Sequence, residues 1–161
     1  MKPAIVCLLL LAAVLGSAQR KPDARGLIEA QISRLEQAYA GRDFEGVRSV
    51  MAATFQGIGI DRHTYSLAAY LQQVKLLFSM AKEIKLSVTI QSLAVAKGSC
   101  RVFTKEILDF KIPNSKKKLD AFRVVSSNEE IWVPSNGVFK ISIEKQKSQS
   151  RMVNGRPAGH S

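Results

Sequence analysis

Residues 27–55 read LIEAQISRLEQAYAGRDFEGVRSVMAATF, and this stretch decides how the rest of the chain can pack. Its first half predicts an amphipathic helix, because four apolar residues recur at spacings of 4, 3 and 4, namely Ile28, Ile32, Leu35 and Tyr39. Gly41 is expected just past the end of this helix, where a positive φ suits glycine. Asp43 is expected to cap a second short helix with its carboxylate. The stretch therefore predicts two helices joined by a tight turn.

A third helix and a set of strands follow this helical hairpin. Residues 54–60 are expected to form a short strand or an irregular passage. Ser66 is expected to cap a helix that ends near Met80, since the next apolar residues keep helical spacing. From residue 84 the apolar period changes to two, which predicts strands over 84–95, 100–112, 117–133 and 139–143. Slips in this alternation predict bulges near Gln91-Ser92 and Ser126-Ser127, and Asn136-Gly137 predicts a tight hairpin.

Helices that come first and a long antiparallel meander that follows are typical of an α+β domain. We expect three N-terminal helices packed on a curved sheet of four antiparallel strands, plus the short extra strand. Bulged and twisted strands curl, so the sheet and the helices together should form a cone. The sequence therefore predicts a pocket between the helices and the concave face of the sheet.

The N-terminus has the features of a secretory signal peptide. Lys2 is followed by an apolar run over residues 4–15 and by the small residues Gly16-Ser17-Ala18. This run has about 12 residues, and a membrane-spanning helix needs roughly 20. We expect cleavage after Ala18 and a secreted or periplasmic protein, with an uncleaved anchor as the alternative.

The whole chain has 161 residues, which is enough for one domain with a hydrophobic core. We expect a signal peptide over 1–18, a linker over 19–23, one domain over 24–144 and a basic, flexible tail over 145–161. Only Cys100 would remain after cleavage, so no intramolecular disulfide is expected. The domain must therefore be held together by packing.

The order of elements resembles the nuclear transport factor 2-like superfamily, and within it the SnoaL-like proteins. Three segments carry the resemblance: Ala40–Val47, Met51–Phe55 and the hairpin from Glu130 to Phe139. The resemblance implies an α+β cone with an apolar pocket, and frequent homodimers through the face of the sheet. It implies no single function, because such proteins include isomerases, cyclases, dehydratases and binding modules.

The ketosteroid isomerase-like members of that superfamily have acidic residues and a tyrosine at positions where this chain differs. The tyrosine position of the first helix holds Leu35, and the position of the catalytic aspartate falls near Gly59. Thr54 stands where an acidic residue precedes the phenylalanine. The differences argue against isomerase chemistry of that kind.

Other residues are candidates for catalysis. Glu106 shares its strand face with apolar neighbours, and a carboxyl group in an apolar pocket can act as acid or base. The alternative is that this face points outward. Asp61 and His63 could form a base at the pocket mouth, although a solvated loop explains them as well.

Ligand binding is expected from five side chains: Tyr39, Phe55, Tyr70, Glu106 and Trp132. For Glu130 and Trp132, a core tryptophan beside a cross-strand salt bridge is the competing interpretation. We expect no metal ion and no cofactor, because the two histidines lie far apart in the sequence and no phosphate-binding loop is present.

The formal net charge of +11 allows contact with an anionic surface, with Lys116, Lys117 and Lys118 and the basic tail as the contact residues. Nucleic acid is not expected, because no aromatic residues interleave with these charges.

These observations predict an exported protein that binds a small apolar molecule without catalysis. Two alternatives stay open. One is an isomerase or lyase that uses Glu106 or Asp61 as base. The other is a dimeric interaction module that binds an anionic partner.

Overall fold

The structure, a computed structural model, describes residues 23–158. Three helices and seven strands follow one another in the order α1 (Ala24–Gly41), α2 (Phe44–Val50), β1 (Met51–Ile58), β2 (Thr64–Ser66), α3 (Leu67–Met80), β3 (Glu83–Ala96), β4 (Ser99–Pro113), β5 (Leu119–Ser135), β6 (Val138–Val153) and β7 (Arg156–Pro157). The α+β class is confirmed. The expected signal peptide over 1–18 and all of the expected linker except residue 23 lie outside the described residues.

The sheet is larger than the sequence predicts. Its strands follow the order β2-β1-β6-β5-β4-β3, and β7 adds to β6. β1 runs parallel to β6, and the other pairs are antiparallel. The expectation of four strands plus one short strand is therefore corrected to seven strands. The expectation of three N-terminal helices is corrected too, because β1 and β2 separate α2 from α3.

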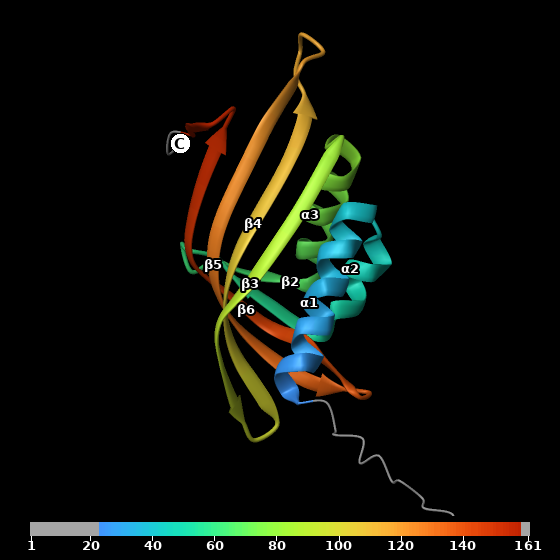
Figure 1. Cartoon of the computed structure of the whole chain (residues 1–161), viewed down its shortest axis with the longest axis vertical. Coiled ribbons are helices and arrows are strands. Elements are labelled where there is room, and N and C mark those ends of the chain that lie inside the picture. The colour runs from blue at the N-terminus through green and yellow to red at the C-terminus, as the bar shows by residue number, and fades with distance from the viewer. Residues whose placement is uncertain (1–22, 159–161) are drawn as a thin grey trace, which may run out of the picture.

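The helices cover one face of this sheet. Figure 1 shows α1, α2 and α3 gathered on one side, while the long strands β3 to β6 twist and curve past them. Between the two layers lies a core whose fully buried members include Ile28, Val47 and Val50 from the helices and Val102 and Trp132 from the strands. The apolar stripe predicted for α1 is buried: Ile28, Ile32, Leu35 and Tyr39 are each at most 6% exposed.

The helix caps agree with the sequence at the N-termini and differ at one C-terminus. The side chains of Asp43 and Ser66 accept hydrogen bonds from Gly46 N and Ala69 N, as expected for caps. The left-handed residue after α1 is Arg42, with φ 55°, and Gly41 belongs to the helix. In this conformation the backbone N–H of Arg42 donates to the carbonyls of Ala38 and Tyr39. Its guanidinium hydrogen-bonds the carbonyl of Lys82, which connects the turn to the start of β3.

Three register shifts decide which side chains face the helices. The bulge expected near Gln91-Ser92 is confirmed between Ile90 and Ser92. The shift expected near Ser126-Ser127 occurs between Ser127 and Asn128, and the extra residue there is Lys147 of β6. A further shift places Ser142 as an extra residue of β6 opposite Ile131 and Trp132. The two extra residues of β6, Ser142 and Lys147, each reverse the inward alternation of that strand.

Residues 145–153 are not a flexible tail. They form the second half of β6 and pair with β5 as far as Val153, and β7 then pairs back on Met152 and Val153. Backbone hydrogen bonds to β5 order this polar segment, although it buries little apolar surface. The predicted domain boundary at residue 144 is therefore wrong.

Among residues 23–158, no helix has the length and apolar character that a membrane-spanning helix requires. Cys100 is buried and is not in a disulfide. Its burial agrees with the interpretation of this residue as a small apolar core side chain.

Candidate functional site

A cavity of about 550 Å³ lies between the helices and the concave face of the sheet. We call it the cone cavity. Its apolar wall comes from α1, α3 and the long strands, and it contains Leu35, Val74, Leu77, Leu86, Leu108, Phe110, Phe122, Val124 and Val153. Its volume falls within the range of roughly 300–1,000 Å³ that is usual for small-molecule sites.

Two carboxyl groups, Glu106 of β4 and Glu144 of β6, line this cavity from strands on either side of β5. Glu106 is paired with Ser126, and Glu144 is paired with Glu130. Glu106 faces inward because β4 keeps its alternation from Val102 onward. Glu144 faces inward because the extra residue Ser142 reverses the alternation of β6 after Ile141. The interpretation in which Glu106 points outward is therefore wrong.

Both carboxyl groups hold their protons more tightly than an exposed glutamate. Burial, followed by the charge of Glu130, raises the pKa of Glu144 to about 8. Burial, followed by the charges of Glu144 and Glu130, raises the pKa of Glu106 well above its ordinary value. A hydrogen bond with Asn128 lowers the pKa of Glu106, and this is the smallest of the four effects. At neutral pH the cavity therefore contains carboxylic acid that can donate a hydrogen bond.

Glu130 has a different environment. Its side chain is 2% exposed and accepts hydrogen bonds from Thr104 Oγ1 and Trp132 Nε1, both at 2.6 Å. Burial raises its pKa, while these two donors act in the opposite direction. Trp132 is 0% exposed and does not line the cone cavity, so its expected role as a ligand contact is corrected. The pair is part of the core, and hydroxyl and indole donors take the place of the expected salt bridge.

Tyrosine hydroxyls lie on the helical side of the cone cavity. Tyr39 of α1 and Tyr70 of α3 line it, and their hydroxyl oxygens are 3.1 Å apart. Burial raises the pKa of both phenols, so both keep their protons and can donate. Tyr65 of β2 joins them at the wall, where a Cβ at Gly57 would overlap its ring. Tyr39, Tyr70 and Glu106 are the predicted ligand residues that the structure brings together.

Phe55, Asp61 and His63 lie outside the cone cavity. Phe55 is 4% exposed, and its ring packs 5.3 Å from the ring of Tyr70, so it supports the wall from behind. Asp61 and His63 lie in the exposed turn between β1 and β2, where the Asp61 carboxylate accepts a hydrogen bond from the backbone N of His63. The expectation of a base at the pocket mouth is corrected to a solvated turn. No group of three potential metal ligands exists among the described residues.

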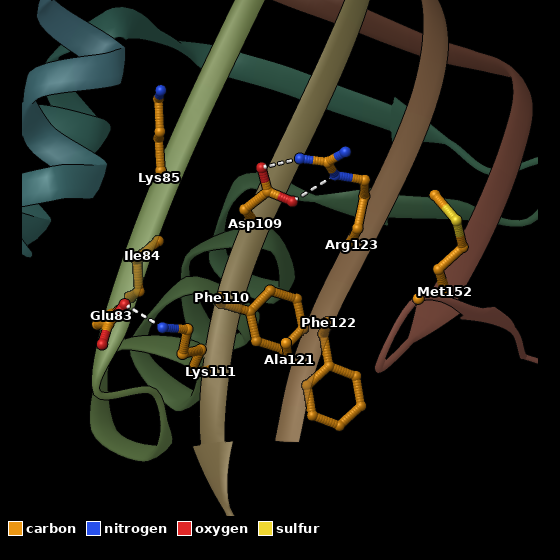
Figure 2. A pocket seen from close by; sticks show the side chains of 11 residues that line it. Glu83, Ile84, Lys85, Asp109, Phe110, Lys111, Ala121, Phe122, Arg123 and Met152 are labelled. Atoms are coloured by element: carbon orange, nitrogen blue, oxygen red, sulfur yellow. Dashed lines mark hydrogen bonds and ion pairs between the residues drawn. The ribbon is translucent and has the colours of Figure 1, made fainter. Parts of the chain in front are cut away.

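A second cavity of about 510 Å³ lies at the far ends of β3, β4 and β5, and Figure 2 shows its lining. Four charged groups there form two ion pairs: Arg123 donates to Asp109 at 2.7 Å, and Lys111 lies 2.8 Å from Glu83. Lys85 also lines this cavity and forms no ion pair with a described residue. The rings of Phe110 and Phe122 stack with their centroids 5.0 Å apart and also line the cone cavity.

Solved structures share this arrangement of helices around a cone, although their sequences are distant. A protein assigned as a scytalone dehydratase from Novosphingobium aromaticivorans has 9% identity and a TM-score of 0.67, with 84% of this chain and 93% of that chain covered. A protein assigned as a dehydratase of the nuclear transport factor 2-like family from Streptomyces avermitilis has 14% identity and a TM-score of 0.59, with 85% and 98% covered. The chain has the nuclear transport factor 2-like fold. A type 2 hexachlorocyclohexane dehydrochlorinase is similar at 12% identity and a TM-score of 0.59, with 84% and 93% covered.

No protein-family model matches the sequence, and no curated protein matches it. The solved structures confirm the resemblance to the nuclear transport factor 2-like superfamily at the level of the fold. Within this fold, Leu35 contributes an apolar side chain to the cavity. Gly59 lies in the turn beside Asp61, and its N–H hydrogen-bonds the carbonyl of His63. Neither position supplies a proton donor or a base.

Glu144 is one of the cavity residues that sequence reasoning missed. The alternation of Phe139, Ile141 and Ile143 predicts that the odd residues of the last strand face inward. Ile141 is 2% exposed, but Ile143 is 36% exposed, because the extra residue Ser142 lies between them. The sequence offers no signal for this, because residues 144–151 are polar at odd and even positions alike.

Proposed function

We propose that this protein binds a small, mainly apolar molecule in the cone cavity and holds one polar group of that molecule at the Glu106 and Glu144 carboxyl groups. The observation that carries this proposal is the pair of proton-bearing carboxyl groups in a cavity that apolar side chains such as Leu35, Val74 and Leu86 also line. A few convergent polar groups in an apolar cavity are typical of small-molecule sites.

The polar group of the ligand is expected to be a hydroxyl or a carbonyl. A carbonyl oxygen can accept hydrogen bonds from a protonated carboxyl group and from a tyrosine hydroxyl of the Tyr39–Tyr70 pair. A ligand carboxylate at the same place would meet like charge whenever Glu106 or Glu144 ionises. Neutral oxygen groups therefore suit this end of the cavity best.

A neutral fluorescent probe tests the use of the cavity. N-phenyl-1-naphthylamine is expected to bind the wild-type protein, and Val124→Trp is expected to weaken binding about tenfold or more by filling the cavity. Thr89→Trp is the control, because this exposed side chain of β3 lies outside the cavity. Circular dichroism confirms that both variants fold. Equal probe affinity in the two variants would contradict the proposal.

A second candidate function is acid–base catalysis of the lyase or isomerase type, and one observation favours it. A carboxyl group with a pKa of about 8, as at Glu144, can both donate and accept a proton near neutral pH. The three compared structures carry the names dehydratase or dehydrochlorinase, which denote elimination reactions. Asp61 is not part of this candidate function because it lies in the exposed turn.

Proton transfer to a bound ligand can be followed without knowledge of the physiological reaction. The ligand recovered with the protein is incubated in D2O with wild-type protein, and mass spectrometry measures deuterium incorporation at carbon. Catalysis predicts incorporation that Glu106→Gln and Glu144→Gln abolish while the probe still binds. Incorporation that is equal with and without protein would contradict this second candidate.

A further inference from the structure

One basic side chain belongs to the cone cavity and takes no part in its carboxyl pair. Arg151 of β6 lines the cavity and is exposed to solvent, so it lies at the mouth. It faces inward because the extra residue Lys147 reverses the alternation of β6 a second time, after Gln146. Sequence patterning alone places Arg151 in the basic tail, without a site.

The guanidinium of Arg151 has spare donors. Its Nε donates to Gln149 Oε1 at 2.9 Å, and its Nη atoms make no hydrogen bond or ion pair with the part of the chain that the structure describes. Arg151 is also not among the groups that shift the pKa of Glu106 or Glu144. Its charge is therefore free to meet a ligand rather than to neutralise the acids.

The cavity thus has two chemically different ends. Arg151 is paired with Val124 in β5, and Glu144 is paired with Glu130, six residues further along the same strand. At about 3.3 Å per residue this places the two backbone positions roughly 20 Å apart. On the sheet side, the cavity residues between these two levels are Glu106, Ser126, Gln146 and Gln149. The apolar wall lies on the helical side, with Leu35 of α1 and Val74 and Leu77 of α3.

We propose that the cone cavity takes a two-ended ligand, with a carboxylate held by Arg151 at the mouth, an apolar body along the α1 and α3 wall, and a hydroxyl or carbonyl at Glu144. This inference rests on the proposed function and adds the anionic end. A guanidinium can hold a carboxylate through two parallel hydrogen bonds. The reverse orientation would place the ligand carboxylate against the acid pair, and a cationic ligand would meet Arg151 at the entrance.

Three matched probes test the two ends by calorimetric titration of the full chain at pH 7: 10-hydroxydecanoate, decanoate and 1,10-decanediol. Wild-type protein is expected to bind 10-hydroxydecanoate about fivefold tighter than the diol, since an exposed ion pair contributes up to about that factor. Arg151→Gln is expected to remove this advantage and to leave the affinity for the diol unchanged. Arg156→Gln is the control, because it removes the same charge from β7 outside the cavity.

The outcomes separate this inference from the proposed function. Two results would overturn the role of Arg151 in holding a carboxylate. One is equal affinity of the wild-type protein for the diol and 10-hydroxydecanoate, and the other is tighter binding of 10-hydroxydecanoate that persists in Arg151→Gln. Either result would still leave the cavity itself as a binding site. Decanoate binding as tightly as 10-hydroxydecanoate overturns the hydroxyl end. Failure of all three probes overturns the two-ended ligand, whereas failure of N-phenyl-1-naphthylamine contradicts the proposed function.

Discussion

At the scale of single residues, the protonation of Glu144 links the cavity to the stability of the fold. The ordinary pKa of a glutamate is 4.5, and the folded state raises that of Glu144 to about 8. Between these values the folded state binds more protons than the unfolded state, so stability falls as pH rises. The contribution is fully present below about pH 4.5 and is lost as the pH rises through about 8.

We therefore predict that Glu144→Gln flattens the dependence of stability on pH between about 5 and 8. At pH 8.5 the variant is expected to be more stable than wild type by about 1–3 kcal/mol, because no charge must be buried. Chemical denaturation at a series of pH values measures this. Glu45→Gln, on an exposed side chain of α2, is the matched control and is expected to keep the wild-type slope. Glu106 and Glu130, whose pKa values burial also raises, are expected to leave a smaller residual slope. A slope as steep as that of wild type would contradict the buried titration of Glu144.

The hydrogen bonds to Glu130 give a second prediction at this scale. Thr104→Val removes one of the two donors while keeping the shape of the side chain, and it leaves a buried carboxyl group short of a partner. The free energy of unfolding is expected to fall by about 1–3 kcal/mol, as measured by urea denaturation. Thr89→Val on the exposed face of β3 should change it by less than about 0.5 kcal/mol. Equal effects would show that the Thr104–Glu130 hydrogen bond contributes nothing to stability.

At the scale of elements, the junction of α1 and α2 depends on the lack of a side chain at one glycine. A Cβ at Gly46 would lie 2.5 Å from Asp43 Oδ2 and 2.9 Å from Ala38 Cβ, so it would disturb both the cap of α2 and its packing on α1. At Gly41 nothing lies within 4 Å of an added Cβ. A side chain at Gly46 would therefore clash with its neighbours, whereas the nearby Gly41 has room for one.

We predict that Gly46→Ala lowers the free energy of unfolding by about 1–2 kcal/mol, although alanine is the better helix former. Gly41→Ala is expected to raise it by about 0.5–1 kcal/mol, because this residue is part of α1 and gains helix propensity. Thermal unfolding of both variants checks the pair. Stabilisation by Gly46→Ala would show that the junction can relax around the new methyl group.

The elements also show how much could be predicted from the sequence. The helices and two N-caps could be predicted because each depends on a few neighbouring residues, such as Asp43 and Ser66. The inward face of β4 follows from simple alternation, which is why Glu106 was a candidate. The switch of face predicted for β5 at Ser126-Ser127 is wrong, because Ser126, Asn128 and Glu130 are all buried and the extra residue belongs to β6. The face of β6 could not be predicted, because Ser142 and Lys147 become extra residues only through pairing with β5. Those two bulges decide the positions of Glu144 and Arg151.

At the scale of the whole molecule, the outer face of the sheet is a candidate dimer surface. Ile107 is paired with Val125, and Ile131 with Ile143, and all four side chains point away from the helices. Packing of this face on that of a second copy would bury them. Residues 1–18 lie outside the described part of the chain, so export stays a prediction.

We predict that the protein is a dimer in analytical ultracentrifugation and that Ile107→Lys shifts it to a monomer, because paired copies would bury the new charge. Val95→Lys is the control, since this side chain is 68% exposed near the β3–β4 turn and lies outside the four-residue patch. A monomeric wild-type protein, or a dimer that persists with Ile107→Lys, would contradict this assembly.

The use of the cone cavity for a small molecule is tested most directly by native mass spectrometry of the protein purified from its own host. The account predicts a bound molecule of a few hundred daltons on the wild-type chain, and the same molecule on Thr89→Trp, whose exposed side chain lies outside the cavity. It predicts that Val124→Trp, which fills the cavity, carries none. Retention of the molecule by Val124→Trp, or an empty wild-type protein under conditions that preserve its fold, would contradict the cavity as the functional site.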